Sequence, residues 1–241
     1  MRFASSSNFR RVGIGSVPGL PLRHLYRSDH LGALDAHDAA QIRALGVTRV
    51  LDFRGVHERT SAACRLADVT VHSLPIEPTI VQKLGELVNA GHRLTGEDVI
   101  LHMQDTYRGF VAQNTPRFAE FFEHLLASDA PTVFHCTAGK DRTGFAAALL
   151  LKAVDAPDDE VMRDYLLTND RLQLPEATRL GLPREAMEVL WRVQPSFLQA
   201  AFAEVDAKYG SLEGYFQDGL GLRARERAIL RKLYRDPLAQ A

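Results

Sequence analysis

The stretch that most constrains the fold of this chain is a ten-residue polar run, 135–144, with the sequence HCTAGKDRTG. Residues 131–134 before it are β-branched or aromatic after a proline, which predicts a short buried strand. Residues 145–154 after it are rich in alanine and leucine and predict a helix of about three turns. The run is therefore a loop between a strand end and a helix start, where unpaired N–H groups and the helix dipole attract an anion.

The loop carries a cysteine and an arginine near its two ends. With five residues between them, Cys136 and Arg142 can lie on opposite sides of one bound phosphoryl group. A helix N-terminus and a neighbouring cation favour the thiolate, which is the reactive form of cysteine. The planar guanidinium of Arg142 can hold two phosphoryl oxygens at once. We predict Cys136 as the nucleophile and Arg142 as the residue that binds phosphate and the transition state.

The other loop residues suit a cradle around that group. Gly139 and Gly144 remove a Cβ where the backbone must curl or approach the helix. Thr143 is expected to bind substrate, and its hydroxyl to bond the sulfur or cap the helix. His135 is expected to brace the cysteine backbone rather than to transfer protons. An inward-facing nest of amides is predicted to bind substrate through Thr137, Ala138, Gly139 and Lys140.

These residue types suit phosphoryl transfer, in which positioning and fixed hydrogen-bond donors supply most of the catalysis. Cys136 would attack in line and form a phosphocysteine that water then hydrolyses, without a metal or cofactor. A tyrosyl leaving group has a conjugate acid of pKa about 10, so a proton donor should be close. Asp141 is the leading acid, although Arg142 beside it would favour its ionised form. Glu77 and Asp105 are the alternatives, and each can also be an ordinary solvent-facing carboxylate.

The run resembles the signature of the cysteine-based protein-tyrosine phosphatase superfamily, and its Gly-Lys-Asp-Arg-Thr-Gly version is similar to that of the atypical bacterial branch. Further motifs of this branch occur in the same order at 8–10, 25–29, 50–54 with Glu58, 165–169 and 209–216, so the resemblance covers most of the chain. It implies activity on phosphotyrosine, sometimes phosphoserine or phosphothreonine, and on phosphoinositides.

Two departures from the pattern of the branch are visible. Arg11-Val12-Gly13 replaces the Asp-Leu-Gly that usually follows Asn-Phe-Arg, and the chain has no Trp-Pro-Asp acid loop like that of the larger tyrosine phosphatases. The second departure suits the atypical branch, in which the resemblance implies that the acid lies inside the loop.

Four other functions use a similar phosphate- or anion-binding loop. A lipid phosphatase acting on phosphoinositides with the same loop stays open, since Lys140 favours acidic substrates. A non-catalytic phosphate-binding module is the remote alternative, which the intact nucleophile and arginine do not support. A nucleotide-binding P-loop is excluded, because Phe134 stands where its first glycine belongs and Asp141 stands where Ser or Thr is needed. A sulfurtransferase would not need Arg142 followed by Thr143.

Composition indicates an ordinary globular enzyme. A chain of 241 residues can bury one sizeable core, and we predict a single domain over 1–241. Its 29 basic and 30 acidic residues leave almost no net charge, so nucleic-acid binding is not expected. The two cysteines, Cys64 and Cys136, do not form a disulfide framework. We expect a cytoplasmic monomer without a membrane span, although the resemblance leaves leaderless export open. A protective disulfide between Cys64 and Cys136 under oxidation is also left open.

The rest of the pattern predicts an α/β fold: a mainly parallel, tyrosine-phosphatase-like central sheet flanked by helices. A helix is expected at 35–45, a buried strand at 47–53 and another at 69–76. Ligands sit at the carboxyl ends of strands in open α/β sheets, so Asp52, Arg54 and Glu58 should support the loop. Arg54 and Glu58 would be either a pair that orients the loop or a surface ion pair. Arg10 and Arg27 would either face phosphate or be solvated.

Helices dominate the remaining segments. Residues 78–113 predict two helices, 78–90 and 99–111, that could form a lid beside the site, and Thr95 with Asp98 resembles a capping arrangement in front of the second helix. Residues 117–127 predict a helix with one apolar stripe. The C-terminal third is predicted to be helical, with helices at 157–169, 183–193, 196–209 and 222–234. The basic residues of 223–235 suggest either a membrane-surface helix or a solvated helix face.

Overall fold

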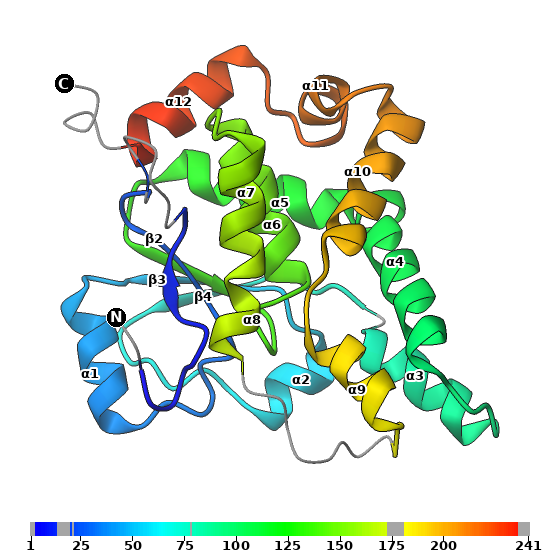
Figure 1. Ribbon diagram of the computed structural model, residues 1–241. Coiled ribbons are helices and arrows are strands. Elements are labelled where there is room, and N and C mark those ends of the chain that lie inside the picture. Colours follow the sequence, from blue (N-terminus) through cyan, green and yellow to red (C-terminus); the bar gives the residue numbers. More distant parts are fainter. Residues whose placement is uncertain (1–2, 14–19, 21, 78, 173–180, 236–241) are drawn as a thin grey trace.

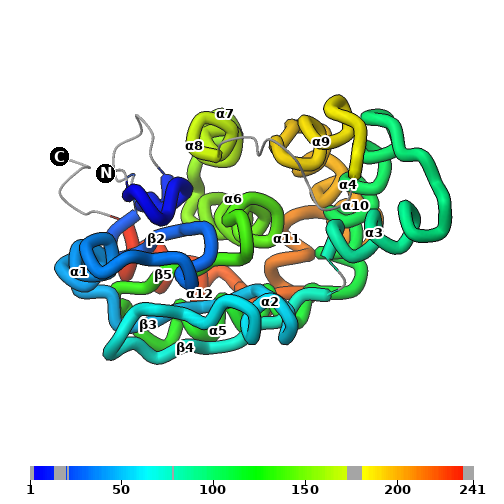
Figure 2. Tube along the Cα trace, turned by 90° about the horizontal axis from the view of Figure 1, so that it is seen from below, coloured from blue at the N-terminus to red at the C-terminus, as the bar shows by residue number. Residues whose placement is uncertain are grey.

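A five-stranded sheet forms the centre of the protein (Figure 1), in a computed structural model that describes residues 3–13, 20, 22–77, 79–172 and 181–235. The strand order is β1-β2-β5-β3-β4, and β5 lies between β2 and β3 (Figure 2). Only the β1–β2 pair is antiparallel within this described sheet, so the predicted mainly parallel α/β architecture is confirmed. The strands are β1 Arg10–Arg11, β2 Leu25–Ser28, β3 Arg49–Asp52, β4 Thr70–Ser73 and β5 Thr132–His135.

Alternating side chains of the central strands divide the core between the two faces of the sheet. Val50 and Val133 pack on the side of α1 (Ala36–Ala44), which Asp35 caps by accepting a hydrogen bond from the Asp38 amide. Leu51 and Phe134, one position later, belong to the larger core on the opposite face. β4 is an edge strand with mostly exposed residues, so it is not buried as predicted for 69–76.

The larger core is built around α6 (Arg142–Ala153), whose side chains are buried almost throughout. Its small alanines allow neighbouring helices to approach closely, and the aromatic stripe of α5 (Thr115–Ala127) packs beside it. The helical C-terminal third is confirmed. It contains α7 Asp158–Leu166, α8 Thr168–Arg171, α9 Arg184–Trp191, α10 Pro195–Tyr209, α11 Leu212–Gly214, the π-helical turn η1 Tyr215–Gly219 and α12 Ala224–Tyr234.

The segment predicted as a possible lid forms two capped helices, α3 (Ile80–Asn89) and α4 (Gly96–Ala112). Thr79 and Thr95 accept hydrogen bonds from the amides three residues later, as expected for helix N-caps, while Pro78 lies outside the described residues. Both helices lie with α9 and α10 at the end of the molecule farthest from α1 (Figures 1 and 2). One face of α4 is buried, so this helix is part of the core, and lid movement stays a prediction.

The central strands bring two polar segments to the same edge of the sheet. Asp52, the last residue of β3, is paired in register with His135, the last residue of β5. The Phe53 amide continues this pairing with a 2.9 Å hydrogen bond to the His135 carbonyl. The residues after β3 and the loop after β5 therefore emerge side by side, as the sequence predicted. The short helix α2 (Val56–Ser61) follows β3 and carries Glu58.

Candidate active site

The loop between β5 and α6 is held by its carbonyl groups, which neighbouring segments bind from outside. Four consecutive carbonyls accept hydrogen bonds. Cys136 O accepts from His135 Nδ1 and Thr137 O accepts from the His30 amide, both at 3.0 Å. Asn8 Nδ2 donates to Ala138 O at 2.9 Å and to Gly139 O at 3.0 Å, and Arg27 Nη2 also donates to Gly139 O at 2.9 Å. The predicted bracing of the cysteine backbone by His135 agrees with the first of these bonds.

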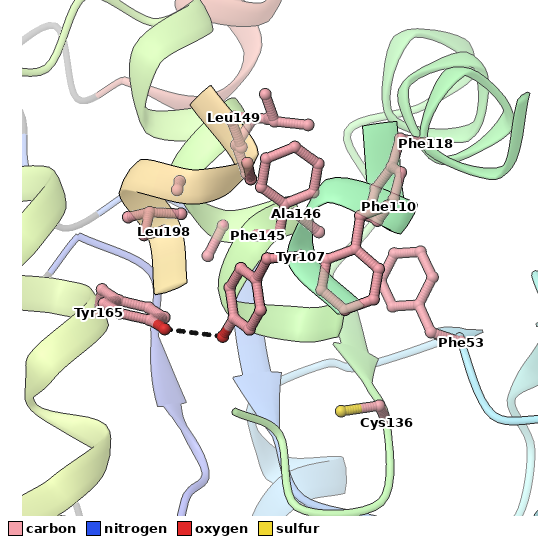
Figure 3. Packing of buried hydrophobic residues seen from close by; sticks show 14 of the residues in the cluster. Phe53, Tyr107, Phe110, Phe118, Cys136, Phe145, Ala146, Leu149, Tyr165 and Leu198 are labelled. Carbon is pink, nitrogen blue, oxygen red and sulfur yellow. Dashed lines mark hydrogen bonds between the residues drawn. The ribbon is translucent and has the colours of Figure 1, made fainter. Parts of the chain in front are cut away.

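The amides of the loop face the other way. In a trans peptide the N–H points opposite to the C=O of the same unit, so outward carbonyls at 136–139 direct the amides of 137–140 inward. Within the described part of the chain, these amides have no hydrogen-bond acceptor. A row of inward N–H groups at the start of a helix is a concave anion site. Cys136 stands at the edge of this row, against the aromatic core of Phe53 and Tyr107 (Figure 3).

Gly139 allows the tight curl of the backbone that was predicted for it, and its close approach is to β2 rather than to the helix. Its φ is +66°, in the left-handed region that disfavours a side chain. A Cβ there would lie 2.2 Å from the Ser28 carbonyl oxygen, which is closer than atoms can approach. Glycine is therefore required for the loop to close against β2.

Arg142 is held by Glu58 from α2 in a two-pronged ion pair. Its Nη1 lies 2.7 Å from Oε2 and its Nη2 lies 2.8 Å from Oε1. Burial alone would raise the pKa of Glu58, but the bonds from Arg142 and Thr137 lower it to about 2. Glu58 is therefore ionised at neutral pH and orients the guanidinium. The predicted pairing of Glu58 with Arg54 is wrong, because Arg54 reaches only the backbone carbonyl of Glu58, at 3.4 Å.

Arg54 instead pairs with Asp52, the last residue of β3. Its Nη2 lies 2.7 Å from Asp52 Oδ2 and its Nε 3.0 Å from Oδ1, with both side chains buried. Because Arg54 is buried, the alternative in which it forms a surface ion pair is wrong as well. The same carboxylate lies 3.7 Å from His135 Nε2, and burial lowers the pKa of His135 so that the imidazole stays neutral. Asp52 and Arg54 thus support the end of β3 beside His135, the residue before Cys136.

Arg10 and Arg27 are neither solvated nor directed at a phosphate, so both interpretations from the sequence are wrong. Both are fully buried and surround Asp164 of α7, with Arg27 Nη1 2.6 Å from its Oδ2. Burial lowers the pKa of Arg10 to about 9. Through Arg27, this buried cluster reaches the Gly139 carbonyl and so ties α7 to the loop.

Asp141 has two donors close to its carboxylate. Lys140 Nζ lies 2.8 Å from Oδ2 and 3.0 Å from Oδ1, and the Tyr107 hydroxyl donates to Oδ1 at 3.0 Å. The cation beside Asp141 is therefore Lys140, while Arg142 turns to Glu58. Tyr107 is in turn 2.7 Å from the Tyr165 hydroxyl (Figure 3). Cys136, Arg142 and Asp141 thus occupy the beginning and end of one amide-lined loop.

Comparison with known proteins agrees with this arrangement. A profile of the tyrosine phosphatase family matches residues 1–236. The chain belongs to this family. A Cupriavidus necator protein assigned by name to the tyrosine-protein phosphatases is 32% identical over 231 residues, covering 91% of this chain and 84% of that protein. The triple specificity protein phosphatase PtpB of Mycobacterium tuberculosis is 34% identical over 253 residues, covering 88% of this chain and 90% of that protein.

A solved structure, TpbA of P. aeruginosa, is similar at 20% identity, with a TM-score of 0.36 over 80% of this chain and 97% of that chain. The sequence matches decide the class of enzyme. This tyrosine phosphatase is a phosphoric monoester hydrolase, as the loop predicted.

The alternative acids lie outside the loop and have other partners. Glu77 is exposed and accepts a 3.0 Å hydrogen bond from the Val56 amide at the start of α2. Asp105 is 65% exposed on α4 and pairs with Arg108. Both environments are those of ordinary solvent-facing carboxylates, the alternative that the sequence leaves open for them. The prediction for the Thr143 hydroxyl is wrong, since it neither bonds the sulfur nor caps α6. This buried hydroxyl has no hydrogen-bond partner in the described residues.

Several site residues were not recognised in the sequence. Asn8 and Tyr165 fell inside quoted motifs, but no role was given to them. Tyr107 follows Val99 and Met103 at four-residue spacing on the buried face of α4, a pattern that indicates core packing and hides a polar contact. Asp164 is an acidic residue within the buried face of α7, and this was the signal that could have revealed its buried partners.

Other features bear less directly on the site. Both cysteines are free thiols, and burial raises the pKa of Cys64. The basic residues around α12 are partly neutralised, since Arg227 pairs with Glu213 and Arg231 pairs with Asp155, each at 2.8 Å. No helix in the described ranges has the length and apolar character needed to cross a membrane.

Proposed function

We propose that the protein hydrolyses phosphotyrosyl residues of proteins through a phosphocysteine on Cys136. The observation that carries the proposal is the row of inward amides bounded by a cysteine at the strand end and an arginine at the helix start. The same loop would stabilise the charge on the equatorial phosphoryl oxygens in both steps.

In the first step the Cys136 sulfur attacks phosphorus, the bond from phosphorus to the tyrosyl oxygen breaks, and Asp141 gives its proton to that oxygen. In the second step water attacks the phosphocysteine and Asp141 accepts a proton from it. The P–S bond then breaks, which releases phosphate and restores the thiolate. Arg142 would hold two phosphoryl oxygens while Glu58 keeps the guanidinium in place, which is consistent with their bidentate contact.

A protein substrate is favoured over a lipid by the surface around α12. A phosphoinositide lies in an anionic membrane, and recognition of that surface relies on unneutralised clusters of basic residues. Two arginines of α12 are instead paired with carboxylates, and Arg227 also packs on the Phe216 ring. This supports a solvated face for α12 rather than a membrane-surface helix. The name of the M. tuberculosis relative, a triple specificity protein phosphatase, also refers to protein substrates.

The thiolate of Cys136 and the single-chain site also bear on where the protein acts and on its oligomeric state. A thiolate nucleophile works only while it is reduced, so we infer action in a reducing compartment such as the cytoplasm. The site is formed by residues of a single chain, which is compatible with a monomer.

The test is turnover of matched substrates by purified variants. Cys136→Ser should lose activity on aryl phosphates, whereas Cys64→Ser should keep it, because both replace a free thiol and only one lies in the loop. Asp141→Asn should turn over slowly and accumulate a phosphoenzyme in rapid-quench experiments with radiolabelled substrate. Full activity of Cys136→Ser would contradict the covalent route.

The substrate class is tested on phosphotyrosyl and phosphoseryl peptides, soluble inositol phosphates and phosphoinositide vesicles. The proposal expects the highest kcat/KM on phosphotyrosyl peptides. Faster turnover of vesicles than of any peptide would instead assign a lipid phosphatase.

A further inference from the structure

The hydroxyl of Tyr107 lies between the proposed acid and a second tyrosine. It is 3.0 Å from Asp141 Oδ1 and 2.7 Å from the Tyr165 hydroxyl, and both tyrosine side chains are almost completely buried (Figure 3). Burial raises the pKa of both phenols well above the usual value, so both keep their protons throughout the working pH range.

The number of protons that the hydroxyls carry fixes the direction of the hydrogen bonds from Tyr165 through Tyr107 to Asp141. A carboxylate can only accept, so Tyr107 uses its single proton on Asp141. The Tyr107 oxygen must then accept the proton that Tyr165 donates. The order of donation is therefore Tyr165 to Tyr107 to Asp141, and each hydroxyl in the chain has one defined orientation.

The two carboxylate oxygens of Asp141 differ in the hydrogen bonds that they accept. Lys140 Nζ lies 3.0 Å from Oδ1 and 2.8 Å from Oδ2, but only its contact with Oδ1 has the geometry of a hydrogen bond. Tyr107 donates to Oδ1 alone. When Asp141 is protonated, an oxygen that already accepts a hydrogen bond is the poorer place for the proton, because two donors would then face each other.

We propose that Tyr107, oriented by Tyr165, is a positioning residue that keeps Asp141 Oδ1 as an acceptor and assigns the transferred proton to Oδ2. This inference rests on the proposed role of Asp141 as general acid. During ester cleavage the proton leaves Oδ2 for the oxygen of the leaving group, and in hydrolysis a proton of the attacking water returns to Oδ2. Tyr107 itself gives up no proton and does not touch the substrate.

The ring of Tyr107 is fixed independently of its hydroxyl. Its centroid lies 5.0 Å from that of Phe110 and 5.9 Å from that of Phe197. Tyr107→Phe therefore keeps the packing and removes both hydrogen bonds of the hydroxyl, the one to Asp141 and the one from Tyr165. Tyr215→Phe is a matched control, because Tyr215 is also buried and its hydroxyl makes a 3.1 Å bond to Thr115 Oγ1 in another part of the core.

The experiment measures kcat for a series of aryl phosphates whose leaving phenols range from strongly acidic to tyrosine-like. An acidic phenol leaves without a proton donor, whereas a tyrosine-like phenol needs one. For Tyr107→Phe we expect about a tenfold loss on the tyrosine-like substrate and little loss on the most acidic one, in line with the strength of a hydrogen bond to a charged group. The dependence of kcat on leaving-group pKa should therefore be steeper than in the wild type, while Tyr215→Phe should keep the wild-type slope.

Asp141→Asn separates failure of the inference from failure of the proposed function. A steep slope for Asp141→Asn with a wild-type slope for Tyr107→Phe would overturn the role of Tyr107 and leave Asp141 as the acid. A shallow slope for Asp141→Asn would overturn the assignment of the acid, and with it this inference. An equal loss on every substrate in Tyr107→Phe, matched by Tyr215→Phe, would show a structural role alone and would also overturn the proposal.

Discussion

Replacement of Gly139 by alanine should disable the loop while leaving the fold largely intact. The left-handed φ of +66° disfavours any side chain by about 1–2 kcal/mol. The added Cβ would also lie 2.2 Å from the backbone oxygen of Ser28 and 2.7 Å from the amide nitrogen of Asp29. Reaching even the closest distance tolerated by real Cβ atoms, 3.0 Å, requires the loop and β2 to separate by about 0.8 Å.

A displacement near 1 Å in a positioned catalytic group can reduce the rate about 10²-fold, which corresponds to about 2.7 kcal/mol of transition-state stabilisation. We therefore expect kcat/KM of Gly139→Ala on an aryl phosphate to fall about 10²-fold, measured together with the free energy of unfolding in urea.

Gly210→Ala is the matched control for backbone strain. This glycine ends α10 with φ +74°, and a Cβ there would meet no atom within 4 Å. Gly210→Ala should lose about 1–2 kcal/mol of stability and keep wild-type kcat/KM. If Gly139→Ala retained activity within threefold of wild type, close approach of the loop to β2 would not determine its geometry. Equal activity losses in both variants would attribute the effect to general destabilisation.

Three further substitutions test the supports of the loop. Glu58→Gln should lower Tm at pH 7, and the difference from wild type should shrink as pH falls from about 4.3 toward 2, because the folded pKa of Glu58, about 2, lies below its ordinary value. Asn8→Ala should reduce kcat/KM on an aryl phosphate more than Asn114→Ala does, since both remove a bond from a side-chain amide to a carbonyl but only Asn8 holds the loop. Asp164→Asn should lower the urea unfolding free energy by about 3–5 kcal/mol, because it leaves Arg27 buried without its partner; a loss below about 1 kcal/mol would contradict this ion-pair argument.

Local patterns predicted the elements that carry the loop. The apolar run before Cys136 and the alanine-rich run after it became β5 and α6, and Thr95 became the cap of α4. These predictions depend only on residues a few positions apart, which is the range over which capping and periodicity act. β2 was not predicted because Arg27 and Ser28 make half of it polar, although all of its residues are buried.

The supports of the loop could not be predicted in the same way, because their partners are distant in the sequence. Arg27 and Asp164 are 137 positions apart, and Asn8 and Gly139 are 131 apart. A buried arginine is improbable without a partner, so the sequence favoured exposed or phosphate-facing arginines. The fold supplies the missing carboxylate through α7, and this converts two apparent ligand-binding cations into structural ones.

The pairing of charges around the loop indicates where its attraction for anions comes from. Three cations near the site each have a carboxylate partner: Arg142 with Glu58, Lys140 with Asp141, and Arg27 with Asp164. The amides of 137–140, in contrast, face inward without an acceptor in the described residues. A phosphoryl dianion is therefore attracted by oriented backbone dipoles and the start of α6 more than by unneutralised side chains. Because such dipoles lie within the protein, salt should screen this attraction less than it would screen an exposed patch of lysines and arginines.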